Sequence, residues 1–165
     1  MSDALIGVLI GGSVAFASSF IIENFKQRKE KIKFKREKIE KVYFEYLNWS
    51  KVMKNMYSLF LHYLELGKNH KDSLKLLADY EDKNKFIKDT NENNIIFLMN
   101  LYFPNLAIIF QETKDLNGKL AFVLMTNNIE EFNLGEFKKL YSNFLINIEN
   151  LDKEIQSVSN RIEKC

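Results

Sequence analysis

The side chains that most often carry out chemistry are few in this chain and far apart. The two histidines are His62 and His70, and we expect His70 to lie in a polar loop after Gly67. The single cysteine is Cys165, the last residue of the sequence. No HExxH or CxxC spacing occurs, and two histidines without spaced carboxylates do not make a zinc site. We therefore expect no metal site, no cofactor and no disulfide framework.

Known catalytic and nucleotide-binding signatures are also missing from the sequence. There is no GxGxxG, no GKS or GKT, and no serine in a GxSxG setting. The acidic run at residues 79–82 is typical of a solvated helix face. We expect that the chain is not an enzyme and has no catalytic residues. Its function must then depend on how its elements meet other molecules.

The composition favours helices as those elements. The chain has 165 residues, of which 46% are hydrophobic, with one proline and six glycines. An all-β protein needs a turn signal roughly every 8–12 residues, which so little glycine and proline cannot supply. We predict an all-α fold, in one domain or in a small domain with an anchor.

The first segment, residues 4–22, contains no charged residue. A helix that spans a bilayer needs about 20 apolar residues. An export signal would begin with Lys or Arg and end in small residues, which this segment does not do. The pattern predicts a transmembrane segment within residues 1–25, with a buried core helix as the alternative. Because Lys and Arg follow it, we expect an inner-membrane location with the N-terminus outside and the bulk of the chain cytoplasmic.

Small residues recur every fourth position in this segment and so lie on one helix face. Such a face lets two membrane helices approach closely, and residues 7–11 form a GxxxG motif. The pattern predicts self-association of the segment and hence a homo-oligomer. The residues of this face are Gly7, Gly11, Ala15 and Ser19.

A basic block follows directly. Residues 23–41 hold nine Lys or Arg against four Glu, a net charge of +5. Beside a membrane, we expect lipid head groups as its partner. Nucleic acid is disfavoured, because few aromatic residues are interleaved for base stacking. The expected head-group contacts are Lys26, Arg28, Lys29, Lys31, Lys33, Lys35, Arg36 and Lys38.

Apolar residues recur at heptad spacing in two parts of the chain, and heptads indicate packed helices. The first series is Phe25, Ile32, Ile39, Tyr46, Met53 and Phe60, in a helix that we expect to end near Gly67. The second series is Leu134, Phe137, Tyr141, Phe144, Ile148, Leu151, Ile155, Val158 and Ile162. We favour packing of this second helix against the first helix of the same chain over packing between two chains.

The middle of the chain leaves one ambiguity. Residues 95–110 are almost wholly apolar, which is compatible with a second membrane contact, but Pro104 interrupts them and no basic cluster flanks them. A buried helix with a break at the proline is the favoured interpretation. The predicted organisation is a transmembrane segment at 1–25, a basic juxtamembrane helix at 26–38 and an antiparallel cytoplasmic helical bundle at 39–165.

Three stretches resemble a loose group of small bacterial proteins. They are the opening MSDALIGVLIGGSVAFASSFI, the Lys/Arg/Glu-rich helix after it, and LYFPNL at residues 101–106. The resemblance implies one N-terminal span and a helical cytoplasmic part in a bacterial inner membrane. The function of that group is uncharacterised, so the resemblance transfers no site residues.

These patterns together predict a non-enzymatic membrane effector or adaptor that acts through helix association in the membrane and a bundle that binds a protein partner. Phage defence is one setting that such an architecture would fit, by analogy only. Two alternatives stay open. One is a membrane-tethered sensor that binds a small ligand in its bundle, and the other is a soluble helical interaction protein.

Overall fold

Every element in the described part of the chain is a helix, which confirms the predicted all-α class. The computed structural model describes residues 2–84, 91–125 and 132–163, and the side chains of residues 18–82, 91–125 and 132–163. Within these ranges there is no strand. The elements are α1 (Ser2–Glu65), α2 (His70–Asn84), α3 (Glu92–Tyr102), α4 (Pro104–Met125) and α5 (Leu134–Glu163).

Helix α1 is one uninterrupted helix of 64 residues, about 96 Å long at the usual rise per residue. No glycine or proline occurs between residues 13 and 66, so nothing in that stretch breaks it. It ends at Glu65, just before Gly67, whose φ of 79° lies in the left-handed region that favours glycine. The N–H of Gly67 donates to Leu64 and that of Lys68 to Tyr63, which closes a Schellman motif. The predicted stop at this glycine is confirmed.

The other helices begin at side-chain caps or at the proline. The side-chain oxygens of Asn69, Asn91 and Asn133 each accept a backbone N–H from the first turn of the helix that follows. Pro104 occupies the first position of α4, where its missing N–H costs nothing. The apolar stretch 95–110 is therefore two helices, α3 and α4, that meet at Phe103.

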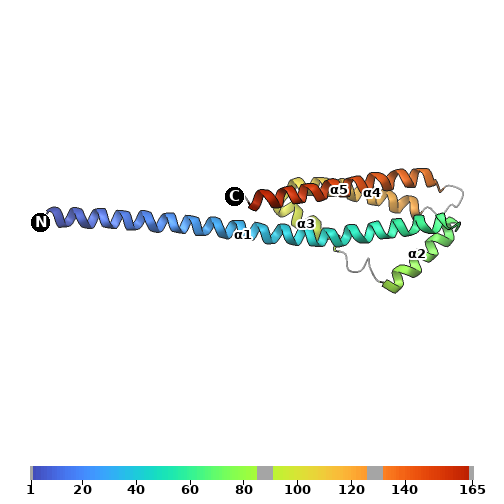
Figure 1. The fold of residues 1–165 in the computed structure, drawn as a ribbon, viewed down its shortest axis with the longest axis horizontal. Coiled ribbons are helices and arrows are strands. Elements are labelled where there is room, and N and C mark those ends of the chain that lie inside the picture. Colours follow the sequence, from blue (N-terminus) through green and yellow to red (C-terminus); the bar gives the residue numbers. More distant parts are fainter. Residues whose placement is uncertain (1, 85–90, 126–131, 164–165) are drawn as a thin grey trace.

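Figure 1 shows how the helices are arranged. Helices α4 and α5 run beside the second half of α1, with α5 in the opposite direction to α1. Helix α3 packs on both α1 and α4, and α2 contacts α1 beyond the turn at Gly67. The first half of α1 extends away from all of them. We call α2 to α5 together with α1 from Ile39 onward the packed region.

Aromatic rings fill the centre of the packed region. Trp49 is fully buried, and its ring meets those of Phe110 and Phe144 edge to face at 5.1 and 6.0 Å. Tyr57 meets Phe144 in the same manner at 5.7 Å. Large aromatic side chains contribute most of the apolar area that such a core removes from water. These contacts hold α1, α4 and α5 together at one level.

The heptad series of α5 lies in this chain's own core. Phe137, Phe144, Ile148, Leu151 and Ile155 are buried, and Tyr141, Val158 and Ile162 are half-buried against them. Leu134, the first residue of the helix, is 40% exposed. The Tyr46 hydroxyl donates to the carbonyl of Ile148 at 2.8 Å, which fixes the register of α5 on α1. The series thus packs within the chain, against α1 and α4.

The predicted location in the inner membrane needs correction. Over the residues that the structure describes, no helix is both long enough and apolar enough to cross a bilayer. The physical reason is the dense charge of α1 from Glu23 onward, where residues 23–41 hold nine Lys or Arg and four Glu. The side chains of residues 4–17, with Gly7, Gly11 and Ala15 of the predicted association face, lie outside the described residues. The lipid head-group contacts were predicted from that location and remain predictions.

Candidate interaction surface

The first half of α1 extends beyond the other helices of the described chain (Figure 1). Every residue from 18 to 31 is exposed. Four large apolar side chains cluster there, with Phe20, Ile21, Ile22 and Phe25 exposed by 53–67%. Contiguous exposed apolar residues of this size mark interaction surfaces in proteins. We call residues 18–35 of α1 the α1 projection.

The α1 projection continues the same helix face that is buried in the packed region. At heptad spacing along this face, Ile39 is 1% exposed, Ile32 is half-buried and Phe25 is 62% exposed. The change occurs where α5 ends at Glu163 and α3 ends at Tyr102. The positions of this series therefore stay apolar beyond the covering helices, because α1 is longer than the helices that cover it.

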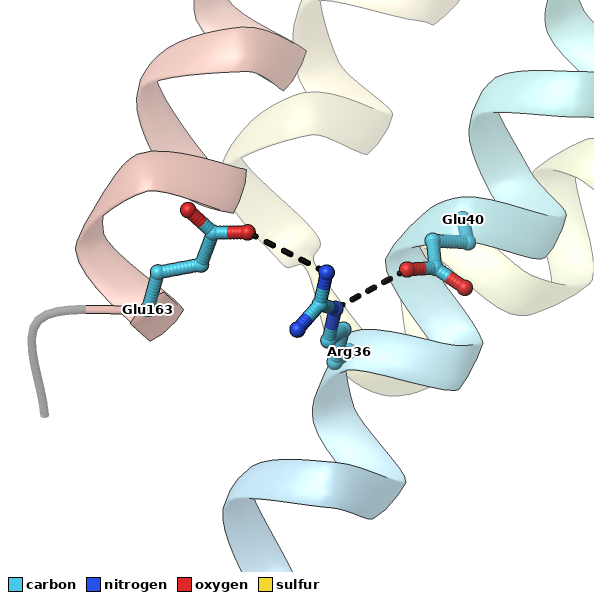
Figure 2. A network of polar contacts seen from close by, with 3 residues as sticks. All are labelled: Arg36, Glu40 and Glu163. Atoms are coloured by element: carbon cyan, nitrogen blue, oxygen red, sulfur yellow. Dashed lines mark hydrogen bonds and ion pairs between the residues drawn. The ribbon is translucent and has the colours of Figure 1, made fainter.

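Two contacts hold α1 at this boundary. Arg36 bridges the last turn of α5 and its own helix, with nitrogens 3.4 Å from the Glu163 carboxylate and 3.0 Å from that of Glu40 (Figure 2). On the other side, the Phe34 ring meets Tyr102 of α3 edge to face at 5.6 Å. These groups are largely exposed, so the ion pairs contribute at most about 1 kcal/mol each. They connect α1 to the last turn of α5 and to the end of α3.

A groove of about 1020 Å³ lies at this boundary, and we call it the terminal groove. Its wall on one side is α1 from Gln27 to Lys35, and its end is formed by the last residues of α3 and α5. The lining is mainly apolar, from Ile32, Phe34, Leu101, Tyr102, Phe103, Val158 and Ile162. The cationic residues in the lining are Arg28, Lys31, Lys35 and Arg161, against the single carboxylate of Glu30.

The structure divides the basic residues singled out in the sequence into separate groups. Arg28, Lys31 and Lys35 line the terminal groove, whereas Lys26, Lys29 and Lys33 do not. Arg36 is in the ion pairs with α5, and the Lys38 ammonium lies 5.0 Å from the centre of the Phe34 ring. Ser19, the described member of the small-residue face, is exposed on the projection. Only some of the block therefore faces a site.

Three groove residues carried no signal in the sequence. Tyr102 ends α3 and Phe103 is its C-cap, both within the apolar stretch 95–110, and Arg161 is one charge near the end of the chain. Their positions depend on α3 and α5 ending at the same level of α1. A sequence periodicity reports the face of a residue along its own helix and not the level at which a second helix stops.

The histidine that the sequence placed in a polar loop is buried instead. His70 is 6% exposed at the start of α2, where its Nε2–H donates to the carbonyl of Leu124 at 3.0 Å. Its ring stacks on Phe132 with centroids 4.4 Å apart. In the described part of the chain no cluster of three or more His, Cys, Asp or Glu could hold a metal ion. The hydrogen bond and the stacking give His70 a structural role that ties α2 to α4.

The other unusual polar groups lie between α1 and α5. Burial raises the pKa of the Tyr46 hydroxyl well above its usual range, and the nearby Asp152 and Tyr43 raise it further, so the hydroxyl stays protonated as a donor. Burial also raises the pKa of Asp152; Lys54 opposes this shift and Glu149 adds to it. The Asp152 Oδ1 atom is buried and lacks a hydrogen-bond partner among the described residues. The hydrogen bond from Tyr46 to the carbonyl of Ile148 gives this tyrosine a structural role between the two helices.

Replacing Asp152 by Asn should stabilise the fold in a pH-dependent way. Since the pKa of Asp152 is raised on folding, its ionised form costs stability above that pKa, and the cost disappears as the pH falls through it. We expect the free energy of unfolding of Asp152→Asn to exceed that of the wild type at about pH 7 and the difference to shrink towards about pH 3. Urea unfolding across this range measures it. Glu154→Gln, at an exposed position of the same helix, is the control and should show a smaller difference.

Comparisons with known protein families, with curated proteins and with solved structures found no match to this chain.

Proposed function

We propose that this chain is a non-enzymatic interaction protein, an adaptor that binds a partner helix along the α1 projection and in the terminal groove. The observation that carries the proposal is the change along one face of α1, from 1% exposed at Ile39 to 62% exposed at Phe25. The apolar positions on this face of α1 are buried by neighbouring helices in the second half of the helix. The exposed apolar positions in the first half are suited to packing against a further helix.

The arrangement of the packed region supports this role. We infer that its helices act as an antiparallel bundle whose aromatic core around Trp49 holds α1 rigidly. A rigid support lowers the entropic cost of binding, because the projection need not be ordered when the partner arrives. Recognition of an amphipathic helix in an apolar groove is a common mode of protein association.

The alternative class, a sensor of a small ligand in the core, lacks an observation in its favour. Rings occupy the centre of the packed region, where Trp49 touches Tyr46, Phe110 and Phe144. The terminal groove, of about 1020 Å³, is an open surface feature between helix ends. Its shape suits an elongated partner better than an enclosed small molecule.

Site-specific photo-crosslinking in the cells that naturally make the chain tests the proposal. Benzoylphenylalanine replaces Phe25 on the α1 projection or Phe44 on the outer face of α1 in the packed region. The two phenylalanines are 62% and 65% exposed, so the reagent is equally accessible at both. We expect a discrete crosslinked species from position 25 and none from position 44. No adduct at position 25, or the same adduct at both positions, would contradict the proposed function.

A further inference from the structure

The charges around the terminal groove indicate the chemistry of its occupant. Four cationic side chains and one carboxylate surround a mainly apolar floor. The electrostatic potential of such a site favours a partner with the opposite sign of charge at its rim. Resting on the proposed function, we propose that the partner is an acidic amphipathic helix, with its apolar face on the groove floor and its carboxylates against Arg28, Lys31, Lys35 and Arg161.

The shape of the site supports a helix rather than an extended strand. The cationic and apolar residues that α1 contributes recur at helical spacing, with Arg28, Lys31, Ile32 and Lys35 on one face. The same face continues towards the N-terminus through Phe25 and Ile21, both exposed. A helix of about three heptads laid along this face would cover it and abut the ends of α3 and α5.

The charge pattern also selects between a foreign helix and a second copy of α1. Residues 23–41 carry a net charge of +5, from nine Lys or Arg and four Glu. Two such helices side by side in register would place like charges opposite each other, which is destabilising. A partner helix with Glu or Asp at its flanking positions would instead place opposite charges against these Lys and Arg side chains. The groove therefore favours a partner of opposite charge over its own copy.

The test uses the full chain and two fluorescent peptides of about 21 residues. Both carry Leu at heptad positions a and d, and they differ in having Glu or Lys at positions e and g. Fluorescence anisotropy measures their binding. We expect the Glu peptide to bind at least about tenfold more tightly than the Lys peptide. Its affinity should fall when NaCl is raised from about 50 to about 500 mM, because salt screens exposed charges.

Two double variants with the same change of charge locate the binding. Lys31→Glu/Lys35→Glu alters the groove, whereas Lys29→Glu/Lys33→Glu alters exposed lysines of the same helix that do not line it. We expect the groove variant to lose about tenfold or more in affinity for the Glu peptide and the control variant to lose much less. Equal circular dichroism spectra of the three proteins verify that the helices are intact.

Three results would overturn the inference. The first is failure of the Glu peptide to bind, and the second is an equal loss of affinity in both double variants, which would mean attraction to net charge alone. The third is occupation of the groove by something else. It would appear as a stable dimer in sedimentation that the groove variant breaks, or as groove-dependent binding to vesicles of anionic lipid without binding of the peptide. A discrete crosslink from position 25 in any of these cases would leave the proposed function standing.

Discussion

Replacing Trp49 by Ala is expected to lower the free energy of unfolding by about 3–5 kcal/mol. Trp49 is fully buried, and three aromatic rings, those of Tyr46, Phe110 and Phe144, lie around it. Removing the indole leaves a cavity that the surrounding helices could fill only by moving inward. Urea unfolding followed by far-UV circular dichroism measures the loss, since the change also removes the single tryptophan of the chain.

Trp49→Phe is the matched control for this prediction. The Trp49 Nε1–H is buried and lacks a hydrogen-bond partner among the described residues, so its removal costs no bond. We expect the phenylalanine variant to lose clearly less stability than the alanine variant, because a ring of the same kind still fills most of the space. A loss below about 1 kcal/mol for Trp49→Ala would show that the packed region is not built around this side chain.

The second large effect is expected at Leu151, in the middle of the heptad series of α5. Leu151 is fully buried, whereas Leu134, of the same series and residue type, is 40% exposed at the start of the helix. We expect Leu151→Ala to lower the free energy of unfolding by about 2–5 kcal/mol. Leu134→Ala should cost less than about 1 kcal/mol, because much less apolar area leaves water there.

The pair of leucine variants also tests how α5 is used. Equal, small losses would mean that the series does not pack inside one chain. A loss at Leu151 that depends on protein concentration would mean that it packs between chains. The measurement is the same urea titration, repeated at two protein concentrations. In the structure, the hydrogen bond from Tyr46 to the Ile148 carbonyl favours the intramolecular alternative.

Local signals in the sequence predicted much of the secondary structure. Gly67 ends α1, Pro104 begins α4, and the alternating spacing of three and four residues from Leu134 to Ile162 marks the buried face of α5. These features depend on one residue or one helix, so they can be recognised without a partner. The absence of glycine and proline between residues 13 and 66 likewise accounts for the length of α1.

The predictions that were wrong concern features that depend on contacts with distant parts of the chain or with other molecules. His70, expected in a polar loop, is buried because Phe132 and the carbonyl of Leu124 come to it from distant parts of the chain. The apolar start of the chain predicted a membrane span, but no helix qualifies among the residues that the structure describes. Apolar composition alone does not distinguish a segment that meets lipid from one that meets another protein surface.

The amino-acid sequence by itself determined that this protein is helical, that α1 runs without a break, and that one heptad series of α1 stays apolar from Phe25 to Phe60. Only the tertiary structure decided at which level α3 and α5 stop covering that series, and which lysines line the groove there. The physical reason is that a heptad pattern shows which residues of one helix lie on the same face. It does not show how far the neighbouring helices extend along that face. The boundary between buried and open surface is set by where the neighbouring helices end, near Tyr102 and Glu163.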